Sequence, residues 1–177
     1  DKDEAFENLS SATGEEQEKV IAWARTVLES EGTQQSEFAS TLERILGRYN
    51  SVDSREFLRE RIKFSPQAAY LAGTLKDSEA EDELVAALDV DWEAVKAPLR
   101  REAATSLGRL KSPSAIAALL KASSEENDRF IEHAIIYALI EISDSSQLLE
   151  ALNNDNPAAR KAAIIALDQL KSDKLTA

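Results

Sequence analysis

The sequence contains no cysteine, and its 177 residues include only five glycines and four prolines. Without cysteine this chain can form no disulfide, thiolate metal site, iron–sulfur cluster or thioether-attached haem, and it has no cysteine nucleophile. No apolar run approaches the roughly 20 residues that span a bilayer. The missing initiator methionine leads us to expect a processed form or a piece of a longer protein.

Basic residues are also scarce, since 21 lysines and arginines stand against 33 aspartates and glutamates, for a formal net charge of −12. A negative surface repels phosphate groups, which argues against nucleic acid as a partner and against attraction to or insertion into an anionic membrane. We attribute the excess of acid to solubility, with an acidic docking face as the alternative.

Alanine, leucine, glutamate, lysine and arginine dominate the chain. These residues lose little on entering a helix, so the predicted fold class is all-α. Thr13 and Glu16 have the spacing of a capping box that would open a helix ending near residue 31. Ser36 can cap a second helix, and Asp53 with Glu56 can open a third. The apolar residues expected to be buried in these three helices are Val20, Ala24, Val27, Leu28, Phe38, Leu42, Ile45, Leu46, Tyr49, Phe57, Leu58 and Ile62.

From residue 65 onward the helix signals become regular. A capping residue precedes a proline at Ser65-Pro66, Ser112-Pro113 and Asn156-Pro157. Proline suits the first helical position because its missing N–H would have no partner there. With Ser78 and Glu81 as a further capping box, the sequence predicts helices at about 66–76, 79–88, 92–110, 113–123, 128–142, 145–153 and 157–170. Pro98 is expected to kink or divide the longest of them.

These helices form a repeat. Leu75, Leu110, Ile142 and Leu170 close equivalent helices at intervals of 28 to 35 residues. One helical hairpin of this size cannot bury its apolar face alone, so successive copies must stack. We predict an α-α superhelix of antiparallel hairpins, with an N-terminal unit at 1–64 continuous with repeats at about 65–90, 91–124, 127–154 and 156–177. The predicted core includes Leu107, Leu110, Leu119, Ile135, Leu139, Ile142, Leu149, Ala163 and Leu167.

The stretches at 99–120 and 156–167 resemble HEAT repeats of the armadillo type, particularly the short bacterial kind that phycobilin lyases also contain. The resemblance extends over about residues 66–177 and implies a solenoid in which the second helix of each repeat tends to line the concave face. The stretches at 128–142 and 163–170 are similar to HEAT segments of large exported bacterial proteins that also carry a c-type haem domain. That second likeness implies a location in the cell envelope or periplasm, and the compartment is otherwise open.

Few residues suggest chemistry. His133 is the only histidine, and without a second imidazole or a nucleophile motif we interpret it as a polar residue on a helix flank rather than a base or ligand. A calcium loop starting at Asp89 is excluded, because Ala94 and Arg100 stand where it needs a glycine and a glutamate. The acidic run around it is interpreted as a solvated face, with weak divalent-cation binding as the alternative: Asp77, Glu79, Glu81, Asp82, Glu83, Asp89, Asp91 and Glu93.

A basic cluster lies earlier in the chain, at Arg44, Arg48, Arg55, Arg59, Arg61 and Lys63. Glutamates alternate with these residues, so pairing within each helix is expected, with a basic docking patch as the alternative. Trp23 and Trp92 are expected to pack between helices rather than to serve as ligand platforms.

The sequence therefore predicts a non-catalytic scaffold or protein-interaction module, with no catalytic, cofactor-binding or metal-binding residue. Its partner would be a protein or other domains of a larger polypeptide, and the expected contact residues are Asp82, Glu83, Lys121, Gln147 and Glu150. The alternative, from the phycobilin-lyase resemblance, is a lyase-like protein that handles a tetrapyrrole. The last repeat has only its first helix, so we also expect self-association through an apolar strip at this edge: Ile164, Ile165, Leu167 and Leu170.

Overall fold

The computed structural model describes residues 2–30, 36–91, 95–125 and 127–170. All regular structure in these ranges is helical, which confirms the predicted all-α class. The α-helices are α1 (Lys2–Ser10), α2 (Glu15–Glu29), α3 (Glu37–Tyr49), α4 (Val52–Arg61), α5 (Pro66–Thr74), α6 (Glu81–Ala87), α7 (Lys96–Leu110), α8 (Ile116–Ser123), α9 (Arg129–Ile142), α10 (Ser145–Glu150) and α11 (Pro157–Gln169). Short 3₁₀ turns are η1 (Ser78–Ala80), η2 (Pro113–Ala115) and η3 (Ala151–Asn153). Within these ranges no helix has the length and apolar character to cross a membrane.

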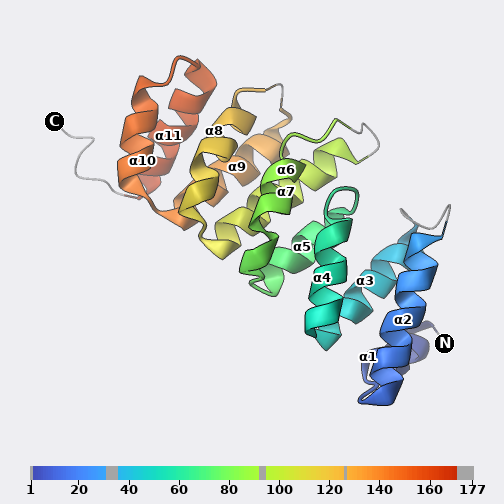
Figure 1. The fold of residues 1–177 in the computed structure, drawn as a ribbon. Coiled ribbons are helices and arrows are strands. Elements are labelled where there is room, and N and C mark those ends of the chain that lie inside the picture. The colour runs from blue at the N-terminus through green and yellow to red at the C-terminus, as the bar shows by residue number, and fades with distance from the viewer. Residues whose placement is uncertain (1, 31–35, 92–94, 126, 171–177) are drawn as a thin grey trace.

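The helices stack in two layers, with the two ends of the chain at opposite ends of the stack (Figure 1). In one layer α3, α5, α7, α9 and α11 pack against one another in that order. In the other layer α4, α6, α8 and α10 each pack against the helix that follows them in the chain. We call the outer surfaces of these layers the odd-helix face and the even-helix face.

Small residues hold the odd-numbered helices close together. A Cβ atom added at Gly73 of α5 would lie 2.7 Å from the Cα of Ser106 in α7, and one added at Gly108 of α7 would lie 2.8 Å from the Cα of Ala138 in α9. The two glycines are 35 residues apart and occupy equivalent positions of successive repeats. Because a real Cβ atom does not lie this close to a backbone atom, glycine sets the spacing of the layer.

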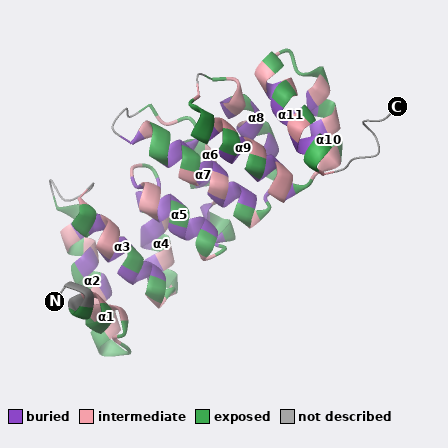
Figure 2. Cartoon of the chain, turned by 180° about the vertical axis from the view of Figure 1, so that it is seen from behind, coloured by how far each residue is buried: buried purple, intermediate pink, exposed green. Residues whose placement is uncertain are grey.

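Burial follows the predicted repeat. Seven of the nine predicted core residues are buried, while Leu110 and Leu149 are half-buried against the core. Buried residues concentrate along α5, α7 and α9 in the middle of the stack (Figure 2). At the C-terminal edge Leu167 is fully buried, Ile165 and Leu170 are half-buried, and Ile164 is 50% exposed.

The N-terminal helices differ more from the prediction. Phe38 is 49% and Trp23 is 43% exposed, so the expectation that Phe38 is buried is wrong, whereas Trp23 packs between helices as expected. Their rings touch edge-on across α2 and α3, with centroids 6.4 Å apart. Val20 and Val27 are only half-buried because Ile21 of the same helix takes the inward position. Helix α1 was not expected, and Trp92 lies outside the described residues.

Three capping predictions hold. The hydroxyl of Ser36 accepts a hydrogen bond from the N–H of Ala39 at 3.0 Å, and that of Ser65 accepts one from the N–H of Ala68 at 3.1 Å. The side-chain oxygen of Asn156 accepts from the N–H of Ala158 at 2.8 Å. Each of these bonds satisfies an N–H that has no partner inside its helix.

The three predicted capping boxes are wrong. Gly14, which has no side chain, precedes α2 in place of the Thr13–Glu16 box. For α4 the cap is Ser51, two residues earlier than the Asp53–Glu56 box. The Ser78–Glu81 pair and Ser112 make no capping bond, because a 3₁₀ turn replaces the first helical turn at both places.

Pro98 does not kink α7. The helix begins at Lys96, so Pro98 stands in its first turn, where a backbone N–H has no partner inside the helix. The segment 92–94, which was predicted as helix, lies outside the described residues.

Candidate functional site

The first groove of the even-helix face lies between α6 and α8 and has a volume of about 250 Å³. Its apolar lining comes from Val85 and Leu88 on one side and from Ala118 and Ala122 on the other. Leu88 and Ala122 are each 3% exposed and belong mainly to the core, so the half-buried Val85 and Ala118 present most of the apolar surface of the groove. Asp89, Lys121 and Glu125 complete the rim.

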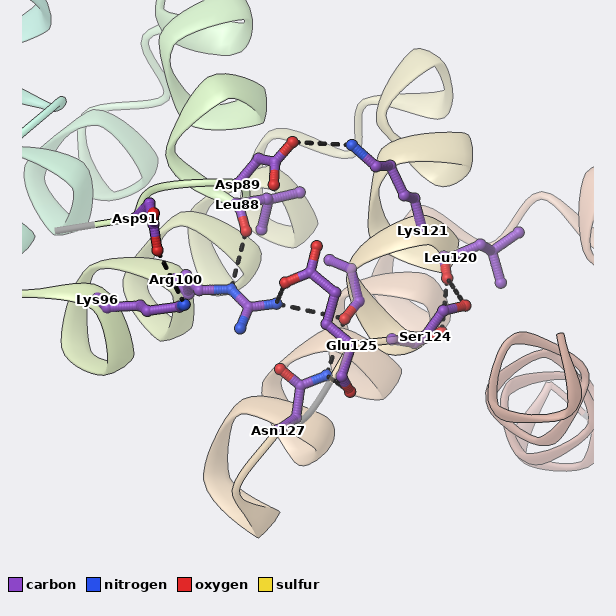
Figure 3. Close-up of polar contacts among 12 residues, drawn as sticks. Leu88, Asp89, Asp91, Lys96, Arg100, Leu120, Lys121, Ser124, Glu125 and Asn127 are labelled. Carbon is purple, nitrogen blue, oxygen red and sulfur yellow. Dashed lines mark hydrogen bonds and ion pairs between the residues drawn. The ribbon is translucent and has the colours of Figure 1, made fainter. Parts of the chain in front are cut away.

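Arg100 of α7 lies beneath this groove and is 2% exposed. Its Nε donates to the carbonyl of Leu88 at 2.8 Å, its Nη2 donates to the carbonyl of Ala122 at 3.3 Å, and Nη2 lies 2.9 Å from the carboxylate of Glu125 (Figure 3). These carbonyls belong to the C-terminal ends of α6 and α8, where backbone acceptors lack partners and a positive charge is favourable. Arg100 therefore fixes the two walls of the groove relative to each other.

Arg160 of α11 makes a similar contact two repeats later. It stands ten residues before Leu170, as Arg100 stands ten residues before Leu110. Its Nη1 donates to the carbonyls of Asn154 and Asp155 at 2.7 and 2.9 Å, just after η3.

A salt bridge crosses the rim of the first groove. The Nζ of Lys121 lies 2.8 Å from Oδ2 of Asp89, and both side chains are well exposed, at 69% and 64% (Figure 3). The hydrogen bond and the charge of Asp89 raise the pKa of Lys121, and the same contact lowers the pKa of Asp89. Because exposed pairs are weak, the ammonium of Lys121 can exchange Asp89 for another carboxylate.

The second groove lies between α8 and α10 and has a volume of about 240 Å³. Its α10 side repeats the α8 side of the first groove at an offset of 29 residues. Gln147, Glu150, Ala151 and Asn154 thus stand where the first groove has Ala118, Lys121, Ala122 and Glu125. The apolar side is Ile116, Ala117 and Leu120.

The five expected contact residues divide between these places. Lys121 lines the first groove, Gln147 and Glu150 line the second, and Asp82 and Glu83 are exposed on α6 without lining either. Sequence reasoning did not find Arg100, Asp89 or Glu125 as members of one site. The spacing of Arg100 and Arg160 before their closing leucines was the available signal. That the five expected contact residues bind a partner stays a prediction.

His133 is exposed on α9, and its ring stacks on that of Tyr137 with the ring centroids 6.4 Å apart. Glu132, which could have oriented it, instead pairs with Lys161 of α11. Among the described residues no three His, Cys, Asp or Glu side chains gather in a way that could hold a metal ion.

The acidic run is less solvated than expected. Asp77 is 6% exposed and pairs with Arg59 at 3.3 Å and Arg55 at 3.9 Å. Hydrogen bonds from the hydroxyls of Ser112 and Ser114 lower the pKa of Glu81. Some of these acids therefore join neighbouring elements.

The basic cluster also pairs between helices, so the expectation of pairing within helices is wrong. Arg48 of α3 binds Glu7 of α1 at 3.0 Å, and Arg61 of α4 binds Glu43 of α3 at 2.5 Å. Neighbouring helices bring these groups closer than the helical spacing does, which sequence periodicity does not reveal.

The comparisons with known proteins concern the same part of the chain. The model of the family described as HEAT repeats matches residues 65–140. The bilin biosynthesis protein PecE of Mastigocladus laminosus is 40% identical over 77 residues, which cover 42% of this chain and 29% of that protein. The bilin biosynthesis protein PecE of Nostoc sp. (strain PCC 7120 / SAG 25.82 / UTEX 2576) is 38% identical over 77 residues, covering 42% and 30%.

These matches confirm the resemblance to HEAT repeats of the phycobilin-lyase kind. They also overturn one expectation: the prediction that the chain is not an enzyme is wrong, because both relatives are named for the biosynthesis of bilins. The absence of a nucleophile motif was weak evidence against an enzyme. The matched residues make up less than a third of the length of these relatives, so most of each relative lies outside the match. Nothing in the comparisons supports the exported haem-domain likeness. Over residues 65–140 this chain is similar to HEAT repeats.

Proposed function

We propose that this chain is the HEAT-repeat part of an enzyme that handles a bilin, an open-chain tetrapyrrole. The observation that carries the proposal is the 40% identity over 77 residues to a protein named for bilin biosynthesis. Packing residues alone account for part of such an identity, so the proposal also needs a surface on which a tetrapyrrole can lie.

The first groove of the even-helix face supports the proposal. Pyrrole rings are flat and largely apolar, and the groove offers Val85, Leu88, Ala118 and Ala122 as apolar lining. A bilin also carries two propionate carboxylates. One of these can take the place of Asp89 on the ammonium of Lys121, which is exposed and lies at the rim.

The size of the groove supports a site that this chain shares with another part of the enzyme or a partner. Pockets that enclose a small molecule measure roughly 300–1,000 Å³, whereas this groove measures about 250 Å³. A tetrapyrrole is therefore held against this face rather than enclosed by it. In the proposal the remainder of the enzyme, or a partner protein, supplies the opposite wall and the groups that react.

Titration with biliverdin, a readily obtained bilin, tests the proposal. We expect a saturable change in the visible absorbance of biliverdin and an induced visible circular dichroism, because a chiral surface selects one twist of the chromophore. Lys121→Gln should weaken binding by about threefold to fivefold, the value of one exposed charge contact.

Lys161→Gln is the matched control. It breaks an exposed salt bridge of the same kind, to Glu132, but on the odd-helix side of the stack, and it should leave the titration unchanged. A wild-type titration without saturation would refute binding by this chain, and equal losses in the two variants would refute the placement in the first groove.

A further inference from the structure

The free charges of the even-helix face are acidic. Asp82 and Glu83 of α6 and Glu150 of α10 are exposed. Within the part of the chain that the structure describes, none of the three takes part in a hydrogen bond or ion pair. They flank the two grooves, since Glu150 lines the second groove and the α6 acids stand one turn before Val85 and Ala86 of the first.

The bases near these grooves are already engaged. Lys121 pairs with Asp89, Lys96 pairs with Asp91 at 3.4 Å, and buried Arg100 is held by two carbonyls and Glu125. The electrostatic potential over α6 and α10 is therefore set by the unpaired carboxylates, in a chain whose formal net charge is −12.

The second groove adds an apolar element to this charge. Ile116, Ala117, Leu120 and Ala151 line it, and Glu150 is its one ionisable residue. At about 240 Å³ it is below the usual size of a small-molecule pocket, and it suits one or two apolar side chains. A surface of small apolar grooves with unpaired acids beside them complements a segment that alternates apolar and basic residues.

We propose that the even-helix face docks a basic amphipathic segment of a partner protein. An apolar side chain of the segment enters the groove between α8 and α10, and its lysines or arginines pair with Glu150 and with Asp82 and Glu83. This docking goes beyond the bilin-handling function, because its apolar anchor is the groove between α8 and α10 and its charge contacts are made by acids rather than by Lys121.

Fluorescence anisotropy with a labelled 18-residue amphipathic helix of leucine and lysine tests the proposal, with a leucine–glutamate helix as the second probe. The wild-type chain should bind the lysine peptide and not the glutamate peptide. The triple variant Asp82→Asn, Glu83→Gln, Glu150→Gln should bind the lysine peptide about tenfold more weakly, as three exposed charge contacts would give. Added salt should weaken wild-type binding.

The matched control changes the net charge by the same amount elsewhere. Glu16→Gln, Glu18→Gln, Glu37→Gln removes three exposed acids of α2 and α3 and should keep wild-type affinity. If both triple variants lose affinity equally, binding follows net charge and the docking site is refuted.

Ala117→Glu separates docking from simple charge attraction. Ala117 is exposed and lines the second groove, so a glutamate there fills the groove while making the face more acidic. Docking predicts weaker binding of the lysine peptide, and tighter or unchanged binding would overturn the proposal. The acid triple variant should keep the biliverdin absorbance change, so this proposal and the bilin proposal can fail separately.

Discussion

The most demanding prediction concerns the buried ion pair between Glu43 and Arg61. Both side chains are almost inaccessible, at 0% and 3% exposure. Arg61 Nε lies 2.5 Å from Glu43 Oε1, the hydroxyl of Ser65 donates to Oε2 at 2.7 Å, and Arg61 Nη1 donates to the carbonyl of Leu28 at 3.2 Å. These bonds join α2, α3, α4 and the start of α5, so the network connects the N-terminal helices to the helices that follow.

Removing one partner should cost far more than removing both. Glu43→Leu removes the carboxylate that binds the buried guanidinium of Arg61, and Arg61→Met leaves the buried carboxylate of Glu43 without that guanidinium. Each single change is expected to lower the free energy of unfolding by about 3–5 kcal/mol. The double variant replaces two charges with apolar side chains of similar size and should fall within about 1–2 kcal/mol of the wild type.

Urea denaturation followed by far-ultraviolet circular dichroism measures all four proteins of this cycle. The exposed pair of Lys19 and Glu15, 3.9 Å apart with side chains 76% and 89% exposed, provides a control cycle in which each change should cost less than about 1 kcal/mol. The reasoning is refuted if Glu43→Leu costs as little as that control, or if the double variant loses the sum of the two single losses.

The pH dependence of the same pair has a definite sign. Burial raises the pKa of Glu43, against smaller lowering effects of the hydrogen bonds from Arg61 and Ser65. The folded chain therefore holds this proton to a higher pH than the unfolded chain does, and the free energy of unfolding contributed by Glu43 falls as the pH rises from the unfolded value through the raised one. Glu43→Gln should remove this slope, which urea titrations at several pH values above 4 would detect.

Three further predictions use the same denaturation assay. Leu139→Ala empties a site with 0% exposure and should lower the free energy of unfolding by about 2–5 kcal/mol. Ile164→Ala, at a half-exposed site, should lower it by less than about 1 kcal/mol. Similar losses in the two variants would mean that the repeat register is wrong. Gly108→Ala would place a Cβ 2.8 Å from the Cα of Ala138 and should cost about 1–3 kcal/mol by forcing α7 from α9; an unchanged midpoint would refute the close approach. Hydrogen bonds from the backbone and side chain of Gln147 lower the pKa of Asp144. The ionised carboxylate therefore stabilises the fold above the pKa of the unfolded chain, and this stabilisation is lost as the pH falls through the pKa of the folded chain. Asp144→Asn should be less stable than the wild type at pH 7 and close to it at pH 2.

The repeat helices were predictable because their packing is periodic in sequence. Leu107, Leu139 and Leu167 recur in one register, and all three are fully buried. The capping residues Ser65 and Asn156 act through their own neighbours in the chain, so local sequence determines them. Contacts of this kind need no knowledge of which helices come together.

The features that sequence did not predict depend on contacts between distant segments. Gly73 could be identified as a contact only once Ser106 was known to lie against it. The same holds for Glu43, whose position among basic residues suggested a bond within its own helix, although its partner is in the next helix. The first groove likewise depends on Arg100, whose guanidinium reaches carbonyls 12 and 22 residues away at the ends of the helices before and after its own.

The two layers differ in how freely their residues can be substituted, and this difference affects where a functional surface can lie. Between α5 and α7, and between α7 and α9, a single added methyl group meets backbone atoms, so the residues there serve packing. The even-numbered helices α6, α8 and α10 are short and are separated by grooves. Their outward residues, such as Lys121 and Glu150, can therefore change without disturbing the stack. A bilin-handling surface and a docking surface can differ between two HEAT proteins while the fold stays the same, which is why the periodic part of the sequence identified the fold and not the chemistry.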